Sequence, residues 1–284
     1  MKPGEASRTA VMVCMGRAIA HGATSVARYE DPVALSLLPE DAQKRTERIR
    51  SSAPARGLGE VLRSAHMRRL SRAMVARTVA IDDTIRESLA PQTQVVILGA
   101  GLDGRAWRMG ELASHVVFEV DHPDSQRDKR ARTAALPKAA GEVRFVAVDF
   151  ERDSLDEALA RAGHDPAQPT IWLWEGVVMY LALPDIEATL AVVQRRSAPI
   201  SRIVVVYHRP ALLLRLIGFV VARLGEPLRS SFEGDAMRAL LERYGFTLVR
   251  DESIAEIGAR LGGDVAGPTR PIHHLRVATA DAHA

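Results

Sequence analysis

An apolar run that ends in a glycine-rich turn, at residues 95–104, constrains the fold of this chain more than any other feature. The run Val-Val-Ile-Leu at 95–98 is β-branched in three of its four positions, which is typical of a strand buried on both faces of a parallel sheet. Gly99 and Gly101 then allow the backbone to turn sharply and to approach a ligand closely. The sequence therefore predicts an α/β fold with a ligand site at the end of this strand.

A pair of carboxylates follows the glycine turn at the distance expected of a nucleoside-binding site. Glu119 and Asp121 end a second apolar run about 20 residues after Gly99, where a carboxylate can bind both hydroxyl groups of a ribose. Glu119 shares a strand face with Asp121, so it either contacts the ribose or supports the turn. This spacing indicates a nucleoside-containing cofactor without deciding which one.

Two classes of enzyme place a glycine turn of this kind at their cofactor. Gly99, Gly101 and Gly104 satisfy the G-x-G-x-x-G pattern of NAD- and FAD-binding folds. In class I methyltransferases, a shorter G-x-G turn holds the methionine part of S-adenosylmethionine, and the carboxylate of the next strand holds the ribose. The remainder of the chain has to decide between an NAD(P)-binding oxidoreductase and a methyltransferase.

The composition is that of a globular protein with one large α/β domain and some additions. The chain has 284 residues, of which 47% are hydrophobic and 26% charged, and its formal net charge is only +3. Arginines are dense between residues 45 and 77, but no aromatic residue that could stack on a base lies among them. We therefore expect solvated helix faces there and no nucleic-acid partner.

The sequence contains no convincing membrane segment. The apolar stretch 211–224 is interrupted by Arg215 and is shorter than the roughly 20 residues that cross a bilayer, and the run at 11–15 is too short for a secretory signal. Cys14 is the only cysteine, so we interpret it as an apolar core residue. A single cysteine is compatible with a reducing compartment. These features predict a soluble, cytoplasmic protein.

The periodicity of the chain changes near residue 90. Helical stretches are expected at 7–21 and 59–89, with further helix starts near Pro32 and Pro39. Beyond residue 93, short apolar runs alternate with helical segments, which indicates repeated βαβ units. Strands are predicted at 94–98, 115–120, 143–148, 170–174, 202–207, 245–250 and 273–279, the first five of them parallel. The segment 251–269 is interpreted as a long excursion between the last two strands.

The predicted architecture is a Rossmann-like, seven-stranded, mostly parallel sheet with helices on both faces. Residues 1–90 would form an N-terminal helical cap that supplies a lid or substrate wall, and residues 91–284 the cofactor-binding core, with a helical insertion at 208–232. Ligands in such sheets bind at the carboxyl ends of the strands.

A glycine turn and three carboxylates follow four successive predicted strands. These positions hold Gly99, Asp121, Asp149 and Glu175, and carboxylates are costly to bury without a partner. Asp149 could accept a hydrogen bond from an adenine amino group while Phe150 packs on the ring; the alternative role of Asp149 is to cap the following helix. Glu175 suits a ligand with an ammonium or sulfonium group better than a dinucleotide with two phosphates.

Four motifs in order resemble one known family, the leucine carboxyl methyltransferases, which include protein phosphatase carboxyl methyltransferases and bacterial enzymes similar to polyketide O-methyltransferases. The motifs are LGAGLD (98–103), RAWR (105–108), FEVDHP (118–123) and EGVVMYL (175–181). The resemblance extends over roughly residues 70–280. One departure is Gly104, where the family usually has threonine or serine.

The resemblance implies S-adenosylmethionine as the cofactor. Arg77 would hold its carboxylate, since a planar guanidinium suits a bidentate contact. Asp121 would hold the ribose, and Glu175 would lie beside the amino group. The full set of cofactor-binding residues expected on this basis is Arg77, Gly99, Ala100, Gly101, Asp121, Asp149, Phe150 and Glu175. No cluster of side chains has the spacing of a metal site, so no metal is expected.

The methyl acceptor is expected to bind beyond the fifth strand. A carboxylate acceptor is already nucleophilic, whereas a hydroxyl acceptor benefits from a general base, for which His208 is the candidate; its alternative is a structural histidine. Tyr207, Arg209 and Tyr180 are the candidate substrate contacts, although Tyr180 could instead pack under the Glu175 loop. The apolar stretch 211–224 would form a helical wall.

These inferences together predict O-methylation, on a carboxylate or a hydroxyl group, of a small and partly hydrophobic molecule such as a secondary metabolite. The alternatives are an NAD(P)-binding oxidoreductase and a cofactor-binding protein without catalytic activity.

Overall fold

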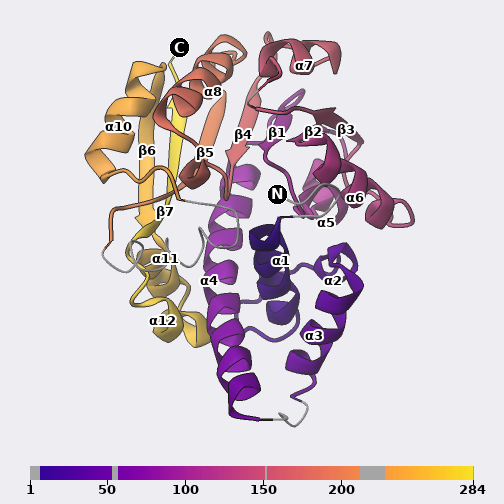
Figure 1. Cartoon of the computed structure of the whole chain (residues 1–284). Helices are drawn as coiled ribbons and strands as arrows, with labels where there is room; N and C mark the ends of the chain where they lie inside the picture. The colour runs from indigo at the N-terminus through magenta and orange to yellow at the C-terminus, as the bar shows by residue number, and fades with distance from the viewer. Residues whose placement is uncertain (1–6, 53–56, 151, 212–227, 284) are drawn as a thin grey trace.

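The protein is built around a seven-stranded sheet with the strand order β3-β2-β1-β4-β5-β7-β6 (Figure 1). The computed structural model describes residues 7–52, 57–150, 152–211 and 228–283. The strands are β1 (Gln94–Leu98), β2 (Val116–Asp121), β3 (Glu142–Ala147), β4 (Thr170–Trp174), β5 (Arg202–His208), β6 (Phe246–Ser253) and β7 (Leu275–Ala282). The first five are parallel, and β7 pairs antiparallel with both β5 and β6. The predicted seven-stranded, mostly parallel sheet is confirmed.

Helices cover both faces of the sheet because alternate residues of each strand point to opposite faces. In β1, Val95 and Ile97 belong to one core cluster, and Val96 and Leu98 belong to the other. Burial on both faces explains why this strand is continuously apolar. The first face is covered chiefly by α4 (Leu58–Ser88) and α11 (Ile254–Leu261), and the second by α7 (Leu155–Arg161), α8 (Leu183–Arg195) and α10 (Gly234–Arg243).

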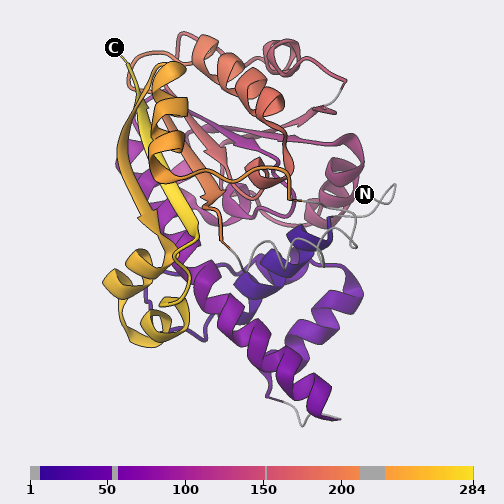
Figure 2. The same cartoon turned by 60° about the vertical axis from the view of Figure 1, so that its left-hand side comes forward.

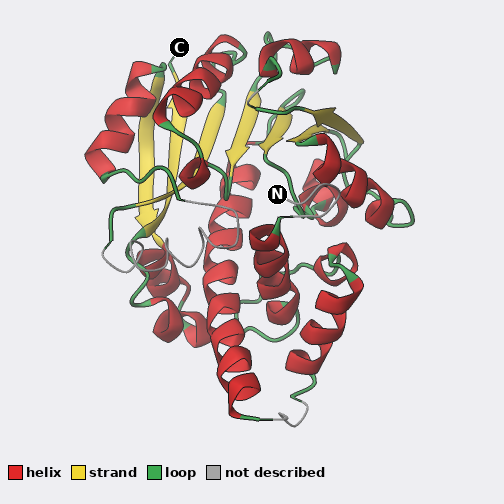
Figure 3. Cartoon of the chain, in the orientation of Figure 1, coloured by secondary structure: helices red, strands yellow, loops and turns green. Residues whose placement is uncertain are grey.

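The N-terminal helices extend the molecule beyond the carboxyl ends of the parallel strands, below the sheet in Figure 3. They are α1 (Arg8–Ala20), α2 (Ala34–Leu37), α3 (Glu40–Arg50) and the first half of α4. The second half of α4 is buried against the sheet, whereas its first half projects away from the sheet (Figure 2). Helix α1 packs against α4, and α3 packs against α1 and pairs with α4 through Arg48 and Glu60. Cys14 of α1 is buried, and its thiol donates to the Ala34 carbonyl oxygen at 3.1 Å, as expected of a core residue.

The segment 251–269 differs from the expected excursion. It contains the end of β6 and two helices, α11 and α12 (Gly263–Thr269). Helix α11 begins at a capping box, in which Ser253 Oγ accepts from the Glu256 amide at 3.2 Å and the Glu256 carboxylate accepts from the Ser253 amide at 2.6 Å. This signal was present in the sequence as Ser-x-x-Glu. Reciprocal capping satisfies amides that a loop would leave to solvent.

The predicted helical insertion at 208–232 is only partly described. His208 ends β5, and residues 209–211 and 228–232 are not helical. The rest of that prediction, including nearly all of the apolar stretch 211–224, lies outside the described residues. The expected division near residue 90 falls between the end of α4 and the start of β1, and it stays a prediction.

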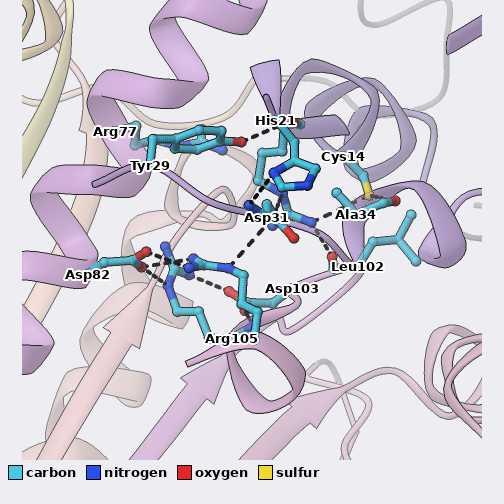
Figure 4. Close-up of polar contacts among 12 residues, drawn as sticks. Cys14, His21, Tyr29, Asp31, Ala34, Arg77, Asp82, Leu102, Asp103 and Arg105 are labelled. Carbon is cyan, nitrogen blue, oxygen red and sulfur yellow. Dashed lines mark hydrogen bonds and ion pairs between the residues drawn. The ribbon is translucent and has the colours of Figure 1, made fainter. Parts of the chain in front are cut away.

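A buried arginine–carboxylate network joins the N-terminal helices to the sheet (Figure 4). It comprises four arginines and four carboxylates, all with side chains no more than 11% exposed: Arg17, Arg77, Arg105, Arg108, Asp31, Asp82, Asp103 and Glu175. Arg105, in the one-turn helix α5 (Arg105–Arg108), lies at its centre. Its Nε is 2.8 Å from Asp82 Oδ1 and its Nη1 is 2.8 Å from Glu175 Oε2, and it also binds Asp103.

The remaining members attach α1 and the segment after it. Arg17 of α1 approaches Asp31 at 3.2 Å and donates to the carbonyl oxygen of Leu102 in the glycine turn. Arg108 binds Asp82 at 2.7 Å. Because the formal charges balance, no member is left as an isolated buried charge, which would cost several kcal/mol. The network therefore fixes α1, α4 and the glycine turn relative to one another.

Replacing Arg105 with glutamine should lower the free energy of unfolding by about 3–5 kcal/mol, because three buried carboxylates lose their shared cation. The matched control is Arg243→Gln, which removes an arginine that is 62% exposed and pairs with Glu187; its effect should stay below about 1 kcal/mol. Urea unfolding at pH 7 measures both. Equal stabilities of Arg105→Gln and the unchanged protein would contradict a central role for Arg105.

The same variant should also change the response to acid. Burial would raise the pKa values of Asp82, Asp103 and Glu175, but the neighbouring arginines outweigh it and lower them below their ordinary values of 3.8 and 4.5. Their contribution to stability is therefore present above about pH 4.5 and is lost as the pH falls through the lowered values. Unfolding curves between pH 5 and 2.5 should be steeper in pH for the unchanged protein than for Arg105→Gln.

Candidate functional site

A cavity of about 670 Å³ opens at the carboxyl ends of β1 to β4. It lies where the strand order reverses, since the chain places β2 and β3 on one side of β1 and β4 on the other. Such a switch point is the usual ligand site of an open α/β sheet. All eight residues that were expected to bind a cofactor line this cavity: Arg77, Gly99, Ala100, Gly101, Asp121, Asp149, Phe150 and Glu175.

The glycine turn forms the floor of the cavity. Gly99 has a φ of +69°, and a Cβ built on it would lie 2.1 Å from Val177 Cγ2, so only glycine fits there. Gly101 also has a positive φ, of +43°. The amides of Gly99 and Ala100 both donate to the Val120 carbonyl oxygen, at 2.8 and 3.0 Å. These bonds fix the turn to the end of β2.

Asp121 lies directly beside this turn. Its Oδ2 accepts from the Gly101 amide at 2.5 Å and its Oδ1 from the His122 amide at 2.6 Å. Burial raises the pKa of Asp121, although the two amide bonds oppose the shift. The carboxylate thus supports the turn and faces the cavity at the same time.

Glu119 takes neither of the two roles expected for it. It does not line the cavity, and its fully buried Oε1 lies 2.7 Å from Lys129 Nζ. Burial raises its pKa to about 7, against the opposing effect of Lys129. The lysine lies on α6 (Pro123–Thr133). The sequence alone did not indicate that it would lie next to Glu119.

Arg77 and Glu175 contact each other across the cavity wall. Arg77 Nε is 2.7 Å from Glu175 Oε1, and Glu175 also binds Arg105. From the sequence, Arg77 and Glu175 were predicted to contact two different groups of the ligand. The structure makes them one ion pair, so that each holds the other in place while both line the cavity.

Asp149 lies two residues beyond the end of β3 and does not cap the following helix. The N-cap of α7 is Ser154, whose Oγ accepts from the Glu157 amide at 3.3 Å. The Asp149 amide donates to Asp153 at 2.8 Å. The helix-cap alternative for Asp149 is therefore wrong, and both Asp149 and Phe150 line the cavity.

Helix α1 covers the glycine turn. Thr9, Ala10 and Val13 line the cavity, and a Cβ on Gly101 would lie 3.5 Å from Ala10 Cβ. The Tyr180 hydroxyl reaches across to Thr9 Oγ1 at 3.2 Å, so Tyr180 does line the cavity. The expected contribution of the N-terminal helices comes from α1. Asp103 also lines the cavity and was missed, although it lies within one of the motifs that carried the resemblance.

The three consecutive residues at the end of β5 do not converge on this cavity. Tyr207 is fully buried on the α8 and α10 face and donates to Asp251 Oδ2 at 2.8 Å. Arg209 is 44% exposed and pairs with Glu233. The expectation that both contact the substrate does not match the structure: neither is among the described residues that line the cavity, and each already has a partner.

His208 points to the opposite face from Tyr207, the face that α4 covers. Its ring stacks on His274 with the centroids 5.6 Å apart. Burial lowers the pKa of His208 to about 4, and the positive charge of Arg77 adds to the effect of His274. His208 is therefore neutral at pH 7. It is not among the described residues that line the cavity.

The G-x-G-x-x-G pattern lacks the structural context of a dinucleotide site. That site requires a helix that opens directly after the glycines and points its amides at the phosphates, whereas the turn here leads into the four-residue helix α5. The Arg105 amide at its start already donates to Asp103 Oδ1, at 2.7 Å. Gly104 instead makes room for Val33, whose Cγ2 would lie 2.7 Å from an added Cβ.

Two negative findings apply to the part of the chain that the structure describes. Within it, no group of three or more histidine, cysteine or acidic side chains is arranged to hold a metal ion. None of the helices described there is both long and apolar enough to cross a membrane.

Comparison with solved structures shows the same fold. A DUF574 family protein from Streptomyces avermitilis superposes with a TM-score of 0.55 at 14% identity, covering 98% of each chain. A protein from Bordetella parapertussis described as a possible exported protein gives a TM-score of 0.55 at 15% identity, covering 99% of this chain and 98% of that one.

Sequence relatives are closer but cover less of the chain. Two proteins that both carry the name "Putative S-adenosyl-L-methionine-dependent methyltransferase" are 41% identical over 141 residues in Mycolicibacterium paratuberculosis and 40% identical over 144 residues in Streptomyces avermitilis. The matches cover 48% and 49% of this chain. This chain spans about half the length of these relatives, 44% and 50%.

The family model described as leucine carboxyl methyltransferase matches residues 10–194. This range includes most of α1, the glycine turn, the arginine–carboxylate network and the residues of the cavity wall from Ala10 to Asp185. The chain belongs to the leucine carboxyl methyltransferase family.

Proposed function

We propose that this protein is an S-adenosylmethionine-dependent methyltransferase that methylates an oxygen atom of a small, partly hydrophobic molecule. One observation carries the proposal: the glycine turn and the three carboxylates predicted at successive strand ends line a single cavity at the switch point of the sheet. Its volume of about 670 Å³ lies within the range of small-molecule sites, roughly 300–1,000 Å³. Membership of the family and the names of the relatives support the same assignment.

The charge of the cavity wall fits this cofactor better than a dinucleotide. Among the described residues, six carboxylates and three arginines line it, and this excess of negative charge attracts a sulfonium and an ammonium group but repels two phosphates. The short helix after the glycine turn disfavours pyrophosphate binding for a separate reason. Both arguments weigh against the NAD(P)-dependent alternative.

The cavity offers a partner for each polar part of S-adenosylmethionine. We assign the ribose hydroxyls to Asp121, the carboxylate to the guanidinium of Arg77, and the ammonium to Glu175. Asp149 and Phe150 take the adenine ring by hydrogen bonding and packing. The ion pair between Arg77 and Glu175 suits a ligand end that itself carries one positive and one negative charge.

The methylsulfonium group supplies an electrophilic carbon, so the protein mainly has to position the acceptor and exclude water. Positioning of this type contributes ~7 to 11 kcal/mol to lowering a barrier. Helix α1 covers the glycine turn and shields that side of the cavity. Arg77 and Asp121 are held by further buried contacts, so little reorganisation is needed when a ligand binds.

The candidate general base for a hydroxyl acceptor was His208. It is not among the described residues that line the cavity, and a pKa of about 4 also makes its imidazole a weak base at neutral pH. A carboxylate acceptor is ionised already and needs no base. We therefore favour a carboxylic acid over a hydroxyl compound as the methyl acceptor.

Asp121→Ala should weaken binding of S-adenosylmethionine at least tenfold, because charge-assisted hydrogen bonds contribute about 1.5–3 kcal/mol. Asp235→Ala, an exposed change in α10 away from the cavity, is the matched control and should leave the affinity unchanged. Isothermal titration calorimetry measures both, with NADH titrated in parallel. Unchanged affinity in Asp121→Ala, or binding of NADH instead, would reject the proposed site or cofactor.

Labelled-methyl transfer to a panel of small carboxylic acids, phenols and alcohols should give turnover with the carboxylic acids. His208→Gln should then keep turnover within a few-fold, whereas a reaction that used it as a base would lose about 10²–10⁴-fold. His283→Gln, at an exposed position, controls for the substitution itself. Cofactor binding without transfer to any of these acceptors would support the non-catalytic alternative.

A further inference from the structure

A second cavity, of about 1040 Å³, lies on the other side of α1 from the proposed methyl-transfer site. It is enclosed by α1, α3, the first half of α4 and α6, and we call it the cap groove. The two cavities share no lining residue among those described. Thr9, Ala10 and Val13 of α1 line the first, whereas Arg8, Val11, Met12 and Met15 line the second.

The cap groove presents an apolar interior. Val11 and Met15 from α1, Ile49 from α3 and Met67 from α4 are buried or half-buried along it. Met12 and Leu62 also line it, and they are 41% and 62% exposed. Exposed large apolar side chains that gather at one concave surface indicate a binding site.

The rim of the cap groove carries an excess of positive charge. Three carboxylates line it, and each is paired with an arginine that also lines it: Asp41 with Arg45 (2.9 Å), Glu60 with Arg48 (3.0 Å) and Asp128 with Arg132 (2.8 Å). Two further arginines, Arg8 and Arg63, have no carboxylate within ion-pair distance among the residues that the structure describes. They give the described rim a net formal charge of about +2.

We propose that the cap groove binds a small amphipathic acid, with a hydrocarbon body and a terminal carboxylate, at a site separate from methyl transfer. The methionine and aliphatic side chains accommodate the body, since flexible methionines adapt to apolar ligands of varied shape. Arg63 binds the carboxylate, for which a guanidinium has the matching fork geometry. Among the described residues, no Phe, Tyr or Trp lines the groove, so it lacks the large stacking surface typical of sites for nucleotide bases.

The ligand of the cap groove is not in position for methyl transfer. Helix α1 separates the groove from the glycine turn, and Arg17 holds that helix against Leu102 and Asp31. An acid bound among Met12, Leu62 and Arg63 would therefore lie behind α1. The groove is a second binding site, and its occupancy does not depend on the proposed cofactor.

The test is titration calorimetry of the full chain with decanoate, below its micelle concentration and without S-adenosylmethionine. Decanoate should bind, and decyltrimethylammonium, which has the same chain and the opposite charge, should bind at least tenfold more weakly. Absence of decanoate binding would overturn the proposal. Equal binding of the two probes would overturn it as well, because it would indicate apolar adsorption without recognition of charge.

Two variants locate the site. Arg63→Gln should weaken decanoate binding about tenfold through loss of the charged contact, and Leu62→Gln at least threefold through loss of apolar contact. Their matched controls are Arg270→Gln, exposed at the end of α12, and Leu183→Gln, at a position of α8 that is 47% exposed; both should bind decanoate unchanged. Full binding by Arg63→Gln and Leu62→Gln would place decanoate elsewhere and overturn the proposal.

Affinity for S-adenosylmethionine, measured on the same variants, separates this inference from the proposed function. Both groove variants should keep it unchanged, which also shows that they are folded. Loss of decanoate binding with an intact cofactor site supports the cap groove as an independent site. A protein that binds decanoate in this pattern but never S-adenosylmethionine would sustain the cap groove and reject the proposed function.

Discussion

The guanidinium of Arg105 is the contact on which the arrangement of this molecule depends. It is 2% exposed and binds carboxylates from α4, from the glycine-turn loop and from the end of β4. An arginine so deeply buried is tolerated only with full compensation of its charge. The three elements therefore have to meet at Arg105, and the cavity wall is made at the place where they meet.

The same electrostatic constraint sets the properties of the site. Glu175 stays ionised because Arg77 and Arg105 lower its pKa against the effect of burial. Arg77 in turn is directed into the cavity wall by its pair with Glu175. Helix α1 joins the network through Arg17, which also reaches the backbone of the glycine turn. The cover of the cavity, its floor and its charged wall thus form one connected unit.

Much of the fold and of the candidate site could be predicted because the signals are local. The run at 95–98 identified β1. The carboxyl ends of four parallel strands lie at one edge of the sheet, so the residues at those ends could be expected to lie close together. The same logic failed beyond β5. Tyr207 and Arg209 lie at the carboxyl end of a parallel strand too, but β7 pairs antiparallel beside that strand, and Tyr207 donates to Asp251 on β6 instead. Which face a strand-end residue takes depends on neighbours that are distant in sequence.

By itself, the sequence determined the order of strands and helices, the conformation of the glycine turn and the carboxylates at the strand ends, because backbone preference and periodicity act over a few residues. Only the tertiary structure decided how the charges are paired. It turned Arg77 and Glu175 from two separate ligand contacts into an ion pair, and assigned Glu119 to Lys129. It also gave Gly104 a packing role beside Val33. Electrostatic partners and steric contacts depend on distance in space, which the order of residues along the chain does not specify.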